Sequence, residues 1–159
     1  MHHMRFLMDA DCLIKLTKAG LKELVVSHDT IVIPEMVRKE VVDAGKERGC
    51  LDATLVEKNV AAKRIQIAKG APSHSTGDEA LIKTFEGGRY DAVATDDRKL
   101  TRILKATDIS FILPGLILYS LQQREIINRE TALRSLDQLA DCISDEEYST
   151  VRLLMEEKS

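Results

Sequence analysis

Residues 5–16 read RFLMDADCLIKL, and this stretch decides the fold. The short apolar run from Arg5 to Met8 ends at Asp9, a pattern typical of a strand buried on both faces of a parallel sheet. From Leu13 to Val25 the apolar residues recur at helical spacing, and Gly20 is the expected break. The stretch therefore predicts the first strand and the first helices of an α/β fold.

Strand and helix patterns alternate along the chain as far as residue 113. Further strands are predicted at Thr30–Ile33, Arg64–Ile67, Ala92–Thr95 and Ile109–Leu113, with helices at 34–45, 51–62, 76–87 and 98–106. After Pro114 the pattern is purely helical, with helices expected at 116–124, 130–140 and 146–157 and with Asn128 and Ser144 as caps. This alternation predicts a parallel sheet of four to five strands flanked by helices, an α/β/α sandwich with a C-terminal helical extension. We expect residues 1–159 to form a single domain, with a core at about 4–113 and the extension at about 114–159.

Composition favours one soluble globular domain, because the 159 residues are 44% hydrophobic and 31% charged. The net charge of -3 argues against a protein that holds nucleic acid by bulk electrostatics. It does not exclude a nuclease, since bound divalent cations restore positive potential where a phosphate must lie. Three distant cysteines outside any CxxC pattern, with no secretory signal and no membrane-spanning stretch, predict a cytoplasmic protein.

Glu40 has an unusual position in its predicted helix. The segment Pro34–Gly45 has apolar residues at helical spacing, and at about 100° per residue Glu40 projects between Met36 and Val37. No Lys or Arg shares that face. Because an unpaired buried charge costs several kcal/mol, we expect Glu40 to share a metal ion with other carboxylates.

Other acids stand where predicted elements begin or end. Asp9 and the pair Asp96 and Asp97 follow strands, and ligands of an open parallel sheet bind outside the carboxyl ends of its strands. Each could instead cap a helix. We favour Asp9 as the ligand and expect Asp11 to start the following helix, whereas residue type alone does not separate Asp96 from Asp97.

Asp78 and Glu79 begin the helix that follows a polar loop. The sequence Thr76-Gly77-Asp78-Glu79 is a capping box, which assigns Glu79 to a bond with the backbone of Thr76. Asp78 is therefore the better candidate ligand. Gathered carboxylates repel one another unless a cation intervenes, and oxygen ligands favour Mg²⁺ or Mn²⁺. Basic residues near these acids are candidates for binding nucleic acid, namely Arg38, Lys39, Arg98, Lys99, Arg102 and Lys105.

Four segments in order resemble the PIN-domain ribonucleases, a family that the VapC-type toxins also resemble. These segments are FLMDADCLIKL, IPEMVRKEVV, TGDEALI and AVATDDRKL, and the tail PGLILYSLQQREIIN is similar to one prokaryotic subgroup of PIN-like proteins. The resemblance implies metal-dependent cleavage of RNA and a possible antitoxin-like partner. It implies that the catalytic and metal-binding acids are Asp9, Glu40, Asp78 and Asp97, with Asp11 and Asp96 as accessory ligands and Glu79 as an alternative to Asp78.

One position departs from the family pattern. The family usually has Thr or Ser directly after the first aspartate, and this chain has Ala10. A hydroxyl that supports the acidic site is therefore missing at this position, which bears on activity more than on fold.

Two alternatives to a ribonuclease stay open at this point. DADCL after an apolar strand also resembles the nucleophile motif of haloacid-dehalogenase-type phosphatases, in which Asp9 would form a phosphoaspartate. The chain could also be a non-catalytic PIN-like binding module, in line with Ala10. Leucines of the tail exceed what a small helical appendage needs internally, which predicts a homodimer; they are Leu116, Leu118, Leu121, Leu133, Leu136, Leu139, Leu153 and Leu154.

Overall fold

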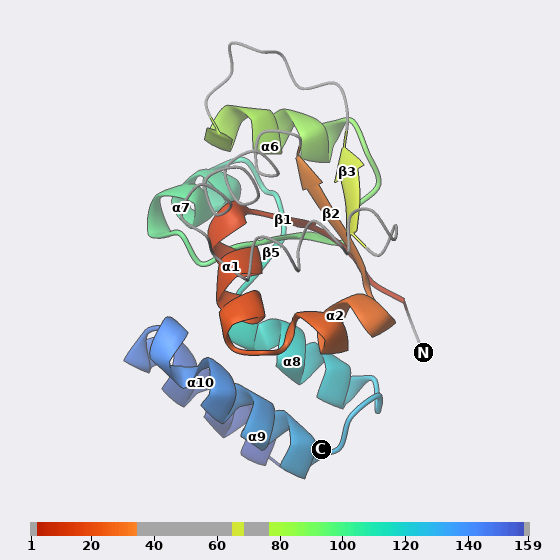
Figure 1. The fold of residues 1–159 in the computed structure, drawn as a ribbon. Helices are drawn as coiled ribbons and strands as arrows, with labels where there is room; N and C mark the ends of the chain where they lie inside the picture. The colour runs from red at the N-terminus through yellow and green to blue at the C-terminus, as the bar shows by residue number, and fades with distance from the viewer. Residues whose placement is uncertain (1–2, 35–64, 69–76, 158–159) are drawn as a thin grey trace.

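A computed structural model describes residues 3–34, 65–68 and 77–157 of the chain (Figure 1). The N-terminal part contains β1 (Arg5–Met8), α1 (Ala10–Lys18), α2 (Lys22–His28), β2 (Thr30–Pro34) and β3 (Ile65–Ala68). It is followed by α6 (Gly77–Glu86), β4 (Ala92–Ala94), α7 (Arg98–Ala106) and β5 (Phe111–Ile112). The last elements are α8 (Pro114–Gln123), α9 (Arg129–Leu139), the 3-10 turn η2 (Ala140–Cys142) and α10 (Asp145–Glu156).

The five strands form one sheet in the order β3-β2-β1-β4-β5, and every pair is parallel. In the central strand, Phe6 lies opposite Ile31 of β2 and Ala92 of β4. The chain builds outward from β1 in one direction through β2 and β3, and in the other through β4 and β5. The strand order therefore reverses between β1 and β4, the position at which ligands bind in open parallel sheets.

Helices cover both faces of the sheet, which confirms the predicted α/β/α arrangement. Phe6, Leu7 and Met8 of β1 are all fully buried. Phe6 and Met8 pack in a cluster with residues of α1, α2 and α8, whereas Leu7 packs on the opposite face against α6 and α7. The apolar run of β1 thus reflects burial on two faces.

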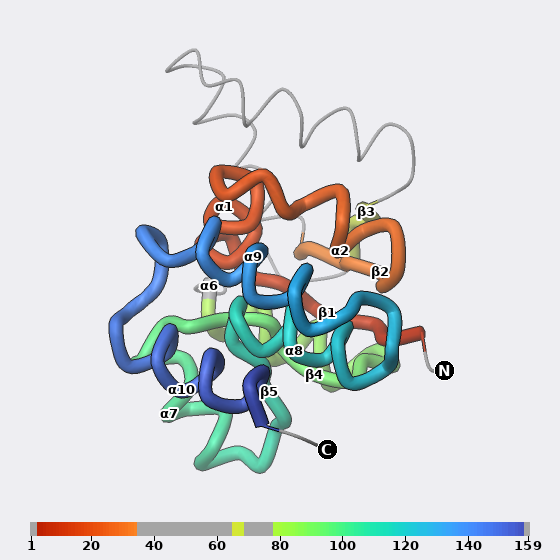
Figure 2. Tube along the Cα trace, turned by 90° about the horizontal axis from the view of Figure 1, so that it is seen from below, coloured from red at the N-terminus to blue at the C-terminus, as the bar shows by residue number. Residues whose placement is uncertain are grey.

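The C-terminal helices share the larger of these two clusters. Ile117 and Leu118 of α8 are fully buried beside Phe6 and Met8 of the central strand. Helices α8, α9 and α10 pack against one another on the outer side of this layer (Figure 2). The extension therefore completes the cover of one sheet face.

The leucines of the tail are not surplus to the packing of the helices, contrary to expectation. Four of the eight leucines, Leu118, Leu121, Leu136 and Leu139, are fully buried, and three more are half-buried. Leu153 alone is exposed, at 62%. The helices use these leucines to pack on one another and on the sheet, so a homodimer stays a prediction without this support.

Most element boundaries differ from the predicted ones by one or two residues. Pro34 was expected to open a helix, but it is the last residue of β2, where it lies opposite Ala68. A proline is tolerated at the end of a strand because little of the hydrogen-bond ladder depends on its missing N–H. The predicted helices at 34–45 and 51–62 otherwise lie outside the described residues. None of the helices in the described ranges is both long enough and apolar enough to cross a membrane.

Candidate active site

Asp9 lies at the carboxyl end of β1, directly beside the end of β4. Its backbone N–H donates to the carbonyl of Ala94 at 3.1 Å, which continues the β1–β4 ladder by one residue. Its side chain caps α1, because Oδ1 accepts the backbone N–H of Cys12 at 2.8 Å. The other oxygen, Oδ2, accepts a hydrogen bond from the hydroxyl of Thr95. Both carboxylate oxygens therefore have a fixed direction.

The expected division of roles between Asp9 and Asp11 was wrong. Asp9 itself is the N-cap of α1, and Asp11 lies exposed in the first turn of that helix. The reason is geometric, since the extended backbone of Asp9 at the strand end lets its side chain reach the N–H three residues ahead. Asp9 therefore both caps α1 and lies beside the ends of β1 and β4.

Burial raises the pKa of Asp9 from 3.8 to about 6. The hydrogen bonds from Thr95 and from the Cys12 backbone oppose this rise, and the charges of Asp11 and Asp96 add to it. No positive charge from the described residues is among the causes of this shift, so burial outweighs two good hydrogen-bond donors. A perturbed acid of this kind at a strand end is typical of a functional site.

Asp96 and Asp97 have separate roles at the end of β4. Asp97 is exposed and caps α7, because its Oδ1 accepts the backbone N–H of Leu100 at 2.9 Å. Asp96 is 11% exposed and forms an ion pair with Lys15 of α1, with 2.6 Å between Nζ and Oδ2. Burial alone would lower the pKa of Lys15, but the hydrogen bond and charge of Asp96 raise it above 10.5, so the lysine is cationic at neutral pH.

Thr95 connects the two strand ends. Its fully buried hydroxyl donates to Asp9 and accepts the backbone N–H of Asp97 at 3.2 Å. The structure therefore brings Asp9, Asp96 and Asp97 to one edge of the sheet. Although Ala10 lacks a hydroxyl, Thr95 supplies one to the same aspartate from the neighbouring strand.

The remaining predicted site residues lie on α6, on α7 or outside the described residues. Asp78 is half-buried in the first turn of α6, and Glu79 beside it is exposed. Glu40 lies outside the described residues, as do Arg38 and Lys39. The other predicted nucleic-acid-binding residues, Arg98, Lys99 and Arg102, are exposed on α7, the helix that Asp97 caps.

Three residues of this region were missed in the sequence. Thr95 directly precedes the acid pair at a strand end, and that position was its only signal. Lys15 lies four residues after Asp11, a spacing that favours a pair within one helix, yet it binds Asp96. Glu147 follows Ser144 with capping-box spacing, but it is buried and its Oε2 accepts the backbone N–H of Gly115 at 3.0 Å. Both of these contacts depend on the tertiary fold.

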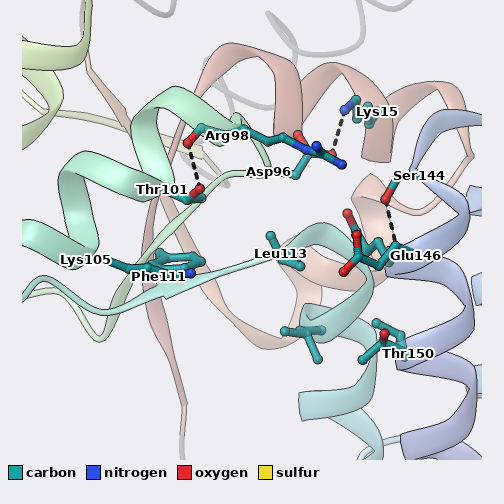
Figure 3. Close-up of a pocket in the computed structure, with 13 residues that line it drawn as sticks. Lys15, Asp96, Arg98, Thr101, Lys105, Phe111, Leu113, Ser144, Glu146 and Thr150 are labelled. Atoms are coloured by element: carbon teal, nitrogen blue, oxygen red, sulfur yellow. Dashed lines mark hydrogen bonds and ion pairs between the residues drawn. The ribbon is translucent and has the colours of Figure 1, made fainter.

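A pocket of about 450 Å³ opens beside this edge of the sheet (Figure 3). Asp96 and Lys15 line one end, and the pocket continues between α7 and α10. Burial raises the pKa of Glu147, which also lines it; the Gly115 N–H and the charge of Lys15 oppose the rise, and Asp96 adds to it.

Comparison with known families identifies the fold and its general chemistry. A model of the PIN-domain family matches residues 5–157. The chain belongs to the PIN-domain family. No curated protein matches the sequence. PIN domains are in general nucleases, hydrolases that act on nucleic acid, and they generally use divalent metals.

The family match spans the C-terminal helices of this PIN domain as well as its sheet. The resemblance in the sequence motifs covered residues 5–113 together with the tail segment at 114–128. Inclusion of α9 and α10 in the match agrees with the shared hydrophobic cluster, in which Leu136 and Val151 pack with residues of β1.

The donor chemistry of this PIN domain fits a divalent cation in part. The acids at the strand ends offer only oxygen atoms, which hard cations such as Mg²⁺ prefer. Asp9 is a half-buried carboxylate, and no cation among the described residues is a cause of its pKa shift. Among residues 3–34, 65–68 and 77–157, however, no group of three or more His, Cys, Asp or Glu is arranged to hold a metal. A complete ligand set would need Glu40 or another donor beyond these ranges.

Proposed function

We propose that this PIN domain hydrolyses phosphodiester bonds of RNA with Mg²⁺ or Mn²⁺. The cation would be held by Asp9, Glu40, Asp78 and Asp97, with Asp96 and Asp11 as accessory ligands. The single observation that carries the proposal is the half-buried carboxylate of Asp9 at the β1–β4 switch point, oriented by Thr95 and by the Cys12 N–H. A bound cation supplies Lewis-acid stabilisation of charge on the phosphate and activates a water molecule.

The chain's own residues orient the acids before any cation binds. The Thr95 hydroxyl and the Cys12 N–H hold the carboxylate plane of Asp9 in one direction. Asp97 is held by its cap bond to Leu100 and by its N–H bond to Thr95. These partners fix the side-chain rotamers of Asp9 and Asp97 in advance. The two carboxylates therefore need little reorientation when a cation and substrate bind.

Lys15 and the cations of α7 balance the negative charge of the acidic edge. Lys15 neutralises Asp96, so Asp96 is a weaker candidate ligand than Asp97. Arg98, Lys99 and Arg102 project from the helix that starts at this edge. Their role would be to attract the phosphates of an RNA strand toward the acids.

Residue substitution tests the proposed acids. We expect Asp9→Asn and Asp97→Asn to abolish cleavage of an unstructured RNA in Mn²⁺ buffer while the proteins stay folded by circular dichroism. Asp108→Asn is the matched control, because Asp108 is exposed at a positive φ that Asn tolerates. Full activity of the Asp9→Asn protein would refute the assignment of the acids.

The same preparations separate the alternative functions. A phosphatase that uses Asp9 as nucleophile would form a trapped phosphoenzyme with a small phosphate ester, and the PIN-domain match gives no support to that reading. A non-catalytic binding module would show no Mn²⁺ binding by calorimetry and no cleavage. Binding of Mn²⁺ excludes the inert module and leaves both enzymes possible. Cleavage of RNA without a trapped phosphoenzyme then supports the nuclease.

We further propose a cytoplasmic toxin of a toxin–antitoxin pair, with an antitoxin-like protein as partner. The resemblance to VapC-type toxins supports this role. Expression of the chain alone should arrest bacterial growth, and the Asp9→Asn protein should not. Growth arrest by both proteins would contradict a toxin role based on RNA cleavage.

A further inference from the structure

The pocket between α7 and α10 begins at the acidic edge. Asp96, which lines its inner end, directly precedes the proposed ligand Asp97. From there the pocket extends along α7 to Lys105, and α10 forms the opposite wall (Figure 3). A substrate strand that reaches the acids can therefore enter this pocket with a neighbouring part of the same molecule.

The α7 wall carries two cations. Arg98 and Lys105 are exposed and line the pocket, and neither has an acidic partner within 4.0 Å in the described part of the chain. Figure 3 shows the Arg98 side chain reaching from the start of α7 toward Asp96. The Lys105 ammonium lies 5.8 Å from the ring centroid of Phe111. Arg98, at the end of this wall that is nearer the acids, offers a binding position to a phosphate group, and Lys105 adds positive charge at the other end.

The α10 wall carries hydrogen-bond acceptors. Glu146 is exposed at the start of α10, with the hydroxyls of Ser144 and Thr150 on the same wall (Figure 3). The neighbouring Glu147 is already bonded to the Gly115 N–H. Glu146 is therefore the more accessible carboxylate of this wall, and a carboxylate can accept two N–H donors side by side.

The floor of the pocket is apolar. Leu113, Leu116 and Val151 line it between the two polar walls. A volume of about 450 Å³ lies in the size range of sites for single small molecules. An apolar floor suits the face of a flat ring. The pocket as a whole is too small for a folded protein partner.

We infer that this pocket binds one nucleotide of a single-stranded RNA beside the cleaved bond, and that it prefers guanine. The inference rests on the proposed function and names a base-binding subsite of it. Arg98 binds the phosphate beside the acids, and the floor takes the base. The Glu146 carboxylate accepts the parallel N1–H and N2–H of guanine. Adenine and cytosine each present one amino group there, and uracil presents one ring N–H.

The lining favours a nucleotide over a charged peptide. An acidic peptide would be attracted by Arg98 and Lys105 but repelled by Glu146. A basic peptide would be attracted by Glu146 but repelled by the two cations. A guanine nucleotide carries negative charge at one end and N–H donors at the other. One guanine nucleotide can therefore bind the cations of the α7 wall and the carboxylate of the α10 wall together. Hydrogen bonds to the edges of unstacked bases are a common way of recognising RNA.

Calorimetry on metal-free protein in EDTA tests the inference without any cleavage. The probes are the 5′-monophosphates of guanosine, adenosine, cytidine and uridine, together with inorganic phosphate. We expect guanosine monophosphate to bind about tenfold more tightly than uridine monophosphate, and inorganic phosphate to bind most weakly. Equal affinity for inorganic phosphate and all four nucleotides would overturn the inference, because it would describe an anion site only.

Substitutions on α10 locate the binding. Thr150→Trp should fill the pocket and abolish saturable binding, whereas Ser149→Trp, one residue away on the same helix and outside the pocket, should not. Glu146→Gln should remove most of the preference for guanine over uracil and leave phosphate binding intact. Unchanged binding in Thr150→Trp, or an equal loss in Ser149→Trp, would overturn the assignment.

The two proposals fail in different ways. Nucleotide binding by a protein that cleaves no RNA in Mn²⁺ would leave the subsite standing and refute the nuclease. The opposite outcome has two parts: the wild type binds no nucleotide, and the Thr150→Trp protein cleaves RNA at an unchanged rate with an unchanged preference near guanine. This outcome would refute the subsite and leave the nuclease standing.

Discussion

At the scale of single residues, Thr95 holds the candidate site together. Its one hydroxyl orients Asp9 of the first strand and accepts the N–H of Asp97 at the end of β4. Asp9 thus has a hydroxyl partner at the end of β4, although Ala10 offers none. Residues that hydrogen-bond to a metal-binding side chain orient it, and mutating them usually lowers metal affinity or activity strongly.

Replacing Thr95 with Val tests this role. The change keeps the shape of the side chain but leaves Asp9 without one donor in a buried position. We expect a loss of about 1–3 kcal/mol in the free energy of unfolding and about 10–100-fold lower Mn²⁺-dependent cleavage. Urea unfolding and an RNA cleavage assay measure the two effects.

Thr95→Ser is the matched control, because serine retains the hydroxyl. It should keep most of the activity of the wild type. Full activity of the Thr95→Val protein would show that Asp9 does not depend on this hydrogen bond.

At the scale of elements, the start of α8 is fitted closely to α10. Pro114 and Gly115 open α8, and the Gly115 N–H, which has no partner within its own helix, donates to Glu147 of α10. A Cβ at Gly115 would lie 3.1 Å from Val151 Cγ2 and 3.3 Å from Glu147 Oε2. The absence of a side chain at this position therefore allows the two helices to approach.

We expect Gly115→Ala to destabilise the fold. Overpacking of this kind typically costs about 1–3 kcal/mol, and the better helix propensity of alanine returns at most about 1 kcal/mol. The comparison is Gly87→Ala, where the nearest atom to an added Cβ is a backbone oxygen at an ordinary 3.4 Å. Equal urea midpoints for the two variants would contradict the close fit of α8 and α10.

The raised pKa of Glu147 predicts a pH dependence. Because burial lifts the pKa of this acid above 4.5 in the fold, the folded chain holds the proton more tightly than the unfolded chain. The free energy of unfolding should therefore fall as pH rises through the window from 4.5 to the folded pKa.

Glu147→Gln removes this ionisation and can still accept the Gly115 N–H. The variant should match the wild type at pH 4 and be as stable or more stable at pH 7, as measured by urea unfolding across that range. A variant that loses more stability at pH 7 than at pH 4 would show that the charge of Glu147 is favourable in the fold.

At the scale of the whole molecule, the C-terminal helices are tied to the sheet by a buried ion pair. Arg124 at the end of α8 donates two hydrogen bonds to Asp29, at 2.6 and 2.7 Å, and Asp29 also accepts the Met4 N–H at 3.0 Å. The Asp29 side chain is fully buried. The pair joins the start of the chain, the loop before β2 and the helical tail.

Arg124→Met should destabilise the fold by about 3–5 kcal/mol, because it leaves the buried Asp29 charge without its cation. The double variant Asp29→Asn, Arg124→Met removes both charges and should recover part of this loss. Urea unfolding of the three proteins measures the difference. A double variant less stable than Arg124→Met would contradict the assignment of the cost to the unpaired carboxylate.

Much of this architecture could be predicted from the sequence because it depends on local patterns. The bounds of α7 at Arg98–Ala106 were predicted correctly from its periodicity and the acid before it, and Asn128 and Ser144 cap their helices as expected. Parallel pairing followed from the alternation of strands and helices.

The missed features are contacts between distant segments. Lys15 and Asp96 are 81 residues apart, and Glu147 meets Gly115 across 32 residues. Local spacing favoured nearer partners for both Lys15 and Glu147, and tertiary packing selected the distant ones. Glu40, the residue that first indicated an acidic site, lies outside the described residues, so its part in the site stays a prediction.

The central claim is that acids remote in the sequence gather around one divalent cation. A crystal structure of the protein grown with Mn²⁺, with the metal located by its anomalous scattering, tests it most directly. The account predicts a manganese peak bound by Asp9 and by Glu40, at the carboxyl ends of β1 and β4. Absence of manganese from this edge in crystals that contain it, or a Glu40 carboxylate that faces solvent on the outside of the molecule, would contradict the account.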